Sequence, residues 1–123
     1  MKIGLIIPCY NVANKIKAKE FINFIESNNE YHICLVNGGS KDDTLSILIY
    51  IRSQTNGKVS VVDIRSHKGT RKAIRIGWRY LCNIREIIEI KHIDVDVTSI
   101  DSKLIKDNIS TNKNLSMHSR FRK

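Results

Sequence analysis

Proline, cysteine and long apolar runs are scarce in this chain of 123 residues. One proline and six glycines exclude collagen-like and proline-rich low-complexity sequences. The three cysteines, Cys9, Cys34 and Cys82, are odd in number and widely spaced, so we expect neither a disulfide framework nor a thiolate metal site. The apolar run from Ile3 to Pro8 is far shorter than the roughly 20 residues of a membrane helix, and we expect no signal peptide before it. These absences predict a single soluble globular domain in a reducing cytoplasm.

Acidic residues are also few, because 12 Asp and Glu face 21 Lys and Arg and the formal charge is +9. This balance favours an anionic partner, such as nucleic acid, nucleotide phosphate or anionic lipid. The charge is spread along the chain, with a modest concentration between Arg65 and Arg79. Blocks of five or more like charges are missing, so an ordinary solvated surface explains the charge equally well. The basic residues are not interleaved with aromatics, and we expect no specific nucleic-acid binding.

Short apolar segments alternate with amphipathic ones. Runs of apolar or β-branched residues predict strands at 2–7 (ended by Pro8), 31–36, 58–65 and 87–93. Apolar residues at spacings of three and four predict helices at 15–27, from Asp42 or Asp43 to about Arg52, and at 70–81. A short helix from Asp101 or Ser102 to about Ile109, and a strand at 115–121, complete the prediction. The alternation indicates right-handed βαβ units and a mostly parallel sheet of the α/β class.

Polar and glycine-rich residues lie where the predicted strands end, at 8–14, 37–43, 66–70 and 94–99. Ligands of parallel α/β sheets bind beyond the carboxyl ends of the strands. Asp94 and Asp96 follow the fourth strand, and two carboxylates there suit Mg²⁺ or Mn²⁺ with positions left for phosphates. The turn predicted at 37–40 could offer backbone N–H groups to an anion, although it matches neither a Walker loop nor a dinucleotide fingerprint. A polar strand end and a tight turn are the simpler interpretations of these two segments.

Four segments, taken in order, resemble the family 2 glycosyltransferases. They read IIPCYN at 6–11, LVNGGSKDDT at 35–44, HKGTRKAIRIG at 67–77 and HIDVDVTS at 92–99, and MHSRF at 117–121 is similar to the family's next strand. The polyprenyl-phosphate and dolichyl-phosphate sugar transferases are the most similar members. The resemblance implies a GT-A, Rossmann-like nucleotide-diphospho-sugar transferase fold for residues 1–123.

The resemblance also implies a set of site residues. Substrate-binding positions, from the nucleoside pocket to the basic segment after the third strand, would be Pro8, Tyr10, Asn11, Asn37, Gly38, Lys68, Lys72, Arg75 and Arg120. Asp94 and Asp96 would be the catalytic pair, with Asp94 orienting the donor and Asp96 holding the Mg²⁺ or Mn²⁺ that bridges the diphosphate. Arg120 would contact a phosphate of donor or acceptor, because a guanidinium binds phosphate in a bidentate fork.

The function implied by the resemblance is transfer of a sugar from a nucleotide sugar to a lipid-phosphate or glycan acceptor. Association with the inner face of a membrane would accompany a lipid acceptor. In the family, the general base and the lipid-facing elements belong to an acceptor half that begins about where this sequence ends at Lys123. The 123 residues are therefore expected to be the donor-binding half.

Gly38 is the main departure from the family pattern. Family members usually have an Asp there that contacts the base or ribose, and glycine cannot accept that hydrogen bond. His67 also stands where Asn is usual. Together with the missing acceptor half, these departures leave a degenerate, non-catalytic GT-A-like binding module as the first alternative. A basic nucleic-acid-binding domain is the second.

Overall fold

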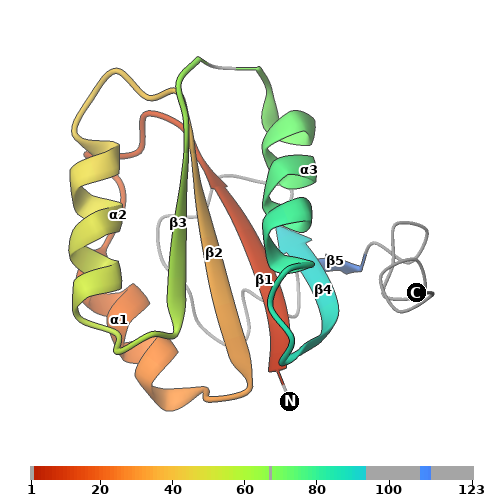
Figure 1. Cartoon of the computed structure of the whole chain (residues 1–123). Helices are drawn as coiled ribbons and strands as arrows, with labels where there is room; N and C mark the ends of the chain where they lie inside the picture. Colours follow the sequence, from red (N-terminus) through yellow and green to blue (C-terminus); the bar gives the residue numbers. More distant parts are fainter. Residues whose placement is uncertain (1, 67, 94–108, 112–123) are drawn as a thin grey trace.

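A five-stranded sheet with helices on both faces forms the centre of the chain (Figure 1). The computed structural model describes residues 2–66, 68–93 and 109–111. The strands, in the spatial order β3-β2-β1-β4-β5, are β1 (Lys2–Cys9), β2 (Tyr31–Gly38), β3 (Val59–Ile64), β4 (Ile87–Ile93) and β5 (Ile109–Thr111). The helices are α1 (Ala18–Ser27), α2 (Thr44–Ser53) and α3 (Thr70–Leu81). Strands β1 to β4 are parallel and β5 is antiparallel to β4, so the predicted α/β class and mostly parallel sheet are confirmed.

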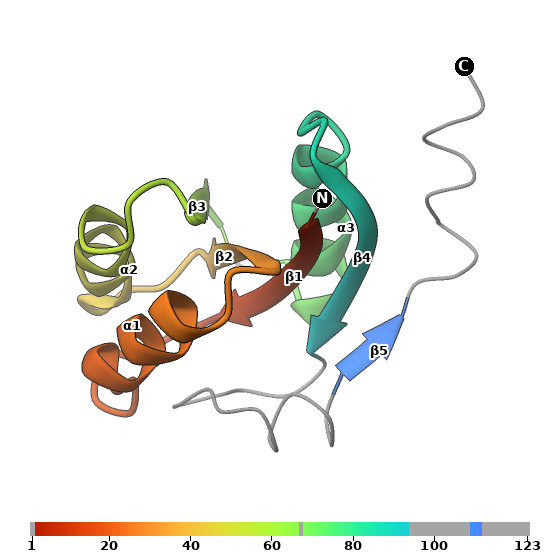
Figure 2. The ribbon, with the colours of Figure 1, turned by 90° about the horizontal axis from the view of Figure 1, so that it is seen from below.

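The two faces of the sheet carry different helices. Figure 2 shows α1 and α2 on one side and α3 on the other. Leu5 and Ile7 of β1 pack in the cluster beneath α1 and α2, whereas Ile6 packs beneath α3, and all three are fully buried. Because alternate side chains of a strand point to opposite faces, a strand covered on both sides must be apolar at every position. The unbroken run of apolar residues in β1 follows from this burial.

Helix α3 packs unusually close to the sheet at Gly77. A Cβ atom at this position would lie 2.8 Å from Cγ2 of Ile6 and 3.1 Å from Cγ2 of Val36. Only glycine permits this approach without displacing the side chains of Ile6 and Val36. The contact fixes α3 on the sheet and thereby places its first turn beside the carboxyl ends of these two strands.

The prediction that Pro8 ends the first strand is wrong, because β1 continues to Cys9. The N–H of Ile3 donates toward β2, to Glu30 O, and the N–H of Lys2 donates toward β4, to Glu86 O. By alternation the nitrogen of Pro8 faces the β4 side, where the β1·β4 pairing has already ended at Ile6. A missing N–H costs no ladder hydrogen bond at such a locally unpaired edge.

Three other boundaries differ from the prediction by more than one residue. Asn37 and Gly38 belong to β2 and not to the following turn, because β3 pairs with them to its end. Helix α1 begins at Ala18 and not at Lys15, because the carbonyl of Val12 accepts the N–H groups of Lys15 and Ile16 in a separate turn.

The predicted helix end at Ile109 is the third difference. Ile109 lies in β5, which pairs with the open edge of β4. The rest of that helix and the strand predicted at 115–121 lie outside the described residues. Among the helices that the structure describes, none is long and apolar enough to cross a membrane.

Candidate nucleotide site

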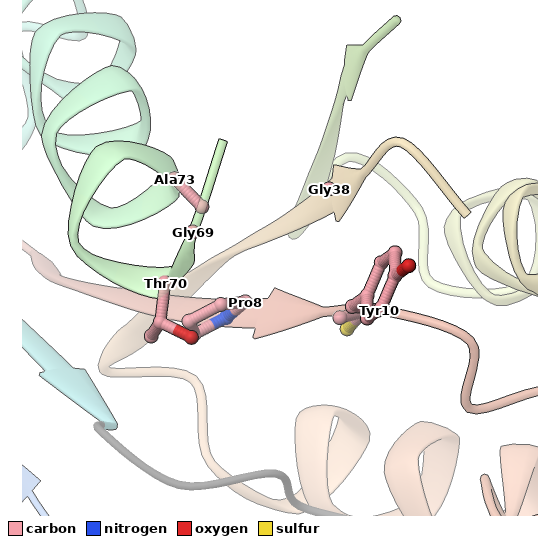
Figure 3. Close-up of a pocket in the computed structure, with 7 residues that line it drawn as sticks. Pro8, Tyr10, Gly38, Gly69, Thr70 and Ala73 are labelled. Atoms are coloured by element: carbon pink, nitrogen blue, oxygen red, sulfur yellow. The ribbon is translucent and has the colours of Figure 1, made fainter. Parts of the chain in front are cut away.

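A pocket lies at the carboxyl edge of the sheet, between the ends of β1 and β2 and the first turn of α3 (Figure 3). Its lining residues are Pro8, Cys9, Tyr10, Gly38, Gly69, Thr70 and Ala73. The sequence resemblance predicted Pro8, Tyr10 and Gly38 as substrate-binding residues, and the structure brings these three together. Gly69, Thr70 and Ala73 were not predicted, because their place in the pocket depends on how α3 packs on the sheet.

Small or apolar residues make up most of the pocket wall. Gly38, Gly69 and Ala73 have little or no side chain, so a ligand can approach the backbone closely. Gly69 has φ = 92°, a conformation that L residues rarely adopt, and its carbonyl accepts the N–H of Ala73 as α3 begins. The phenol of Tyr10, 36% exposed, supplies an aromatic surface. Such a wall suits a flat ring more than a charged group.

Asn11 and Ser40 join the loop after β1 to the loop after β2. The N–H of Asn11 donates to Oγ of Ser40 at 2.9 Å, and Oδ1 of Asn11 accepts the N–H of Lys41 at 2.8 Å. Asn11 has φ = 50°, and asparagine is one of the few residues that tolerate this conformation. The side-chain oxygen of Asn11 therefore holds these two loops together beside the pocket. Asn11 does not line the pocket itself.

Thr44 and Asp42 continue this connection. Oγ1 of the buried Thr44 accepts the N–H of Val12 at 2.9 Å and donates to Oδ1 of Asp42 at 2.5 Å. Asp42 also accepts the N–H of Thr44 at 3.0 Å and the N–H of Ala13 at 3.1 Å. The hydrogen bond from the Thr44 hydroxyl, reinforced by those from the two backbone N–H groups, lowers the pKa of Asp42 below its ordinary value of 3.8.

Asn37 is buried at the end of β2 and is hydrogen-bonded within the protein. Its Nδ2 donates to Oδ1 of Asp63 at 2.8 Å, and its Oδ1 accepts the N–H of Ser40 at 3.4 Å. The N–H of Ser40, one of those that the predicted turn at 37–40 could offer to an anion, is directed to Asn37 Oδ1, and the neighbouring N–H of Lys41 is directed to Asn11. Asp63 is the acidic residue that the sequence reasoning missed at this edge, and only the pairing of β2 with β3 identifies it.

Three of the predicted basic residues, Lys68, Lys72 and Arg75, are exposed and lie outside the pocket lining. Lys68 directly precedes Gly69, while Lys72 and Arg75 lie on the outer face of α3. Asp94, Asp96 and Arg120 lie outside the described residues, so their roles stay predictions. Within residues 2–66 and 68–93, no three His, Cys, Asp or Glu side chains gather in a way that could hold a metal ion.

Residues 5–81 match the family model described as glycosyl transferase family 2. This match includes every residue that lines the pocket. A search of curated proteins finds no match.

Solved structures share the fold. S. aureus TarS 1-349 in complex with UDP-GlcNAc aligns with a TM-score of 0.63 and 22% identity, over 87% of this chain and 30% of that one. The mannosyltransferase PcManGT from Pyrobaculum calidifontis, in complex with GDP-Man and Mn²⁺, aligns with a TM-score of 0.55 and 20% identity, over 64% of this chain and 24% of that one. Both are GT-A glycosyltransferases, so the predicted GT-A fold is confirmed. The chain spans less than a third of the length of either structure.

The hydrogen bonds of Asp42 predict a pH dependence of stability. A carboxylate whose pKa is lowered by folding stabilises the native state fully above its unfolded pKa, and this contribution is lost as the pH falls through the folded pKa. Urea unfolding of the unmodified chain and of Asp42→Asn should therefore differ most near neutral pH. We expect the difference to shrink below about pH 4 as Asp42 becomes protonated. A constant difference from neutral pH down to about pH 2 would contradict the assignment.

Proposed function

The chain belongs to glycosyl transferase family 2, and we propose that it binds a nucleoside diphosphate sugar and takes part in transferring the sugar to a lipid-phosphate or glycan acceptor. One observation carries the proposal. The three segments that build the pocket, at the ends of β1 and β2 and at the start of α3, are separated in sequence, yet all lie within the matched residues and at the edge where parallel α/β sheets bind ligands.

The pocket would receive the nucleoside of the donor. Pro8, Tyr10 and the backbone of Gly38 and Gly69 offer a narrow, mostly apolar wall to a base or ribose. TarS 1-349 was solved in complex with UDP-GlcNAc, and PcManGT in complex with GDP-Man. They support nucleoside diphosphate sugars as the ligand class without choosing between uracil and guanine.

A divalent cation fits the chemistry of the residues after β4. β4 lies beside β1, with His92 opposite Ile6, and ends at Ile93, so the chain leaves the sheet near the pocket edge. Asp94 follows Ile93 directly, and we assign Asp96 as the metal-anchoring carboxylate. Bound Mg²⁺ or Mn²⁺ would neutralise the diphosphate as it leaves. The Mn²⁺ in the PcManGT complex supports this assignment.

Two further roles complete the proposed reaction: lysines that attract the diphosphate, and a general base that removes the acceptor proton. Lys68 lies next to the pocket and Lys72 lies in the first turn of α3, where each can attract the negative diphosphate. Transfer forms a bond from the acceptor oxygen to the anomeric carbon, breaks the bond from that carbon to the diphosphate, and removes the acceptor proton. The pocket lining has no carboxylate or imidazole, so we assign proton removal to a group outside this lining.

A non-catalytic binding module is the second candidate, and Gly38 is the observation that favours it. The structure places this glycine in the pocket wall, where the family usually has Asp, and no acidic side chain belongs to the lining. A domain of this kind would keep the pocket and bind nucleotide weakly.

Metal-dependent nucleotide binding tests the proposed function. In calorimetric titrations with UDP and GDP, Mn²⁺ should strengthen binding of at least one nucleotide by roughly 10-fold or more, about 1.4 kcal/mol. Asp96→Ala should remove the difference, because the metal loses its anchor. Asp43→Ala, which removes an exposed carboxylate at the start of α2, is the matched control and should keep it. Equal binding with and without Mn²⁺ in the unmodified chain would refute the metal assignment.

Introducing a carboxylate at Gly38 tests whether the missing acidic side chain weakens nucleotide binding, as the second candidate requires. The φ of Gly38 is not positive, so Asp is compatible with this backbone position. A hydrogen bond to a charged group contributes about 1.5–3 kcal/mol, so Gly38→Asp should raise affinity for UDP or GDP by roughly 10-fold or more. Gln54→Glu, an added charge at the end of α2, should have no such effect. A folded Gly38→Asp protein with unchanged affinity for both nucleotides would show that this position does not face the nucleoside.

A further inference from the structure

The outer face of α3 carries a continuous row of positive charge. Successive helical residues are about 100° apart, so the buried Ala73, Ile74, Gly77 and Leu81 define the side that packs on the sheet. Arg71, Lys72, Arg75 and Arg79 project from the opposite side and are all exposed. The helix has no Asp or Glu. This row, called here the α3 cationic face, extends for about 12 Å at 1.5 Å per residue.

The helices on the other side of the sheet show no such charge. α1 and α2 together carry two basic residues, Lys19 and Arg52, and two acidic residues, Glu20 and Glu26. The ion pairs found in the described part of the chain, Lys17 with Glu20 and Lys58 with Glu26, also lie on that side. The positive charge of the helical layers is therefore concentrated on one face, and the four cations of α3 have no acidic partner among the described residues.

We propose that the α3 cationic face docks on an anionic lipid bilayer. A row of cations on the outside of a helix presents neither a cavity nor a fixed arrangement of donors, so it fits a diffuse negative surface better than a shaped ligand. Clusters of Lys and Arg on an amphipathic helix are attracted to anionic headgroups in this way. Tyr80, 43% exposed, lies at the flank of the row and suits the headgroup region, where an aromatic ring can be half-solvated.

Nucleic acid fits this face less well. Single-stranded nucleic acid needs aromatic rings between the cations as stacking platforms, and the four positions of the row are separated by Ala73, Ile74, Ile76, Gly77 and Trp78. Trp78 packs against the buried cluster beneath α3, and its indole nitrogen is enclosed. No aromatic side chain therefore stands within the row to stack on a base.

Docking through this face would bring the nucleotide pocket close to the membrane. α3 begins at the pocket wall, with Thr70 in the lining and Arg71 next to it. The pocket would then lie within one helix length of the headgroups, about 18 Å. The proposal does not rest on sugar transfer, because it follows from the charge of α3 alone.

Vesicle co-sedimentation tests the proposal. The chain should bind vesicles made of equal parts phosphatidylserine and phosphatidylcholine, and should not bind phosphatidylcholine alone. Arg71→Gln with Arg79→Gln should weaken binding roughly 30-fold, or about 2 kcal/mol at 1.4 kcal/mol per factor of ten. The matched control, Lys19→Gln with Arg52→Gln, removes the same charge from the opposite helical layer and should weaken binding much less. Gln keeps a high helix propensity, and circular dichroism would verify folding of both variants.

Two results would overturn the proposal. Equal loss of vesicle binding in both double variants would show that net charge acts without a specific face. Binding to duplex DNA at physiological salt that exceeds binding to the vesicles, and that is lost in the α3 variant, would assign the face to nucleic acid instead. Titration with UDP in the same α3 variant keeps the tests separate, because nucleotide affinity should not change when only Arg71 and Arg79 are replaced.

Discussion

The parallel pairing of β1 with both β2 and β4 is the constraint on which the site depends. It places the carboxyl ends of these strands at one edge, where Pro8 at the end of β1, Tyr10 directly after it and Gly38 at the end of β2 line the same pocket. Burial of β1 on both faces makes this arrangement rigid, because shifting the register of a strand buried on both faces would disturb two clusters of packed side chains at once.

Polar loops are held in place by hydrogen bonds that bridge residues about thirty positions apart. Asn11, Ser40, Asp42 and Thr44 join the first two loops, with partners separated by 29 to 32 residues. From the sequence, Asn11 was predicted to bind substrate and Asp42 or Asp43 to begin a helix. In the structure, the side chains of Asn11 and Asp42 form these hydrogen bonds instead. Asn11 and Asn37 support the loop geometry in this structure, and the pocket wall is left to small residues and Tyr10.

The sequence predicted those features that arise from local periodicity. Buried strands and amphipathic helices leave a pattern of apolar residues, so β1 to β4 and the three helices were predicted with small errors at their ends. Features that depend on distant partners were missed. Continuation of β1 through Pro8 depends on where β4 stops pairing, and the role of Ala73 in the pocket depends on the close packing of Gly77 against Ile6. Asp63 became visible only through its register with Asn37.

The central claim is that the pocket at the ends of β1 and β2 and the start of α3 receives a nucleotide. The most direct measurement is the mapping of backbone amide chemical shifts by NMR while UDP or GDP is added in the presence of Mg²⁺, which is diamagnetic and does not broaden the resonances. We predict that the largest shifts fall on Tyr10, Gly38, Gly69 and Thr70, with smaller shifts in the loop held by Asp42. Saturating shifts confined to the opposite edge of the sheet, near Asn29 or Gly57, would contradict the claim.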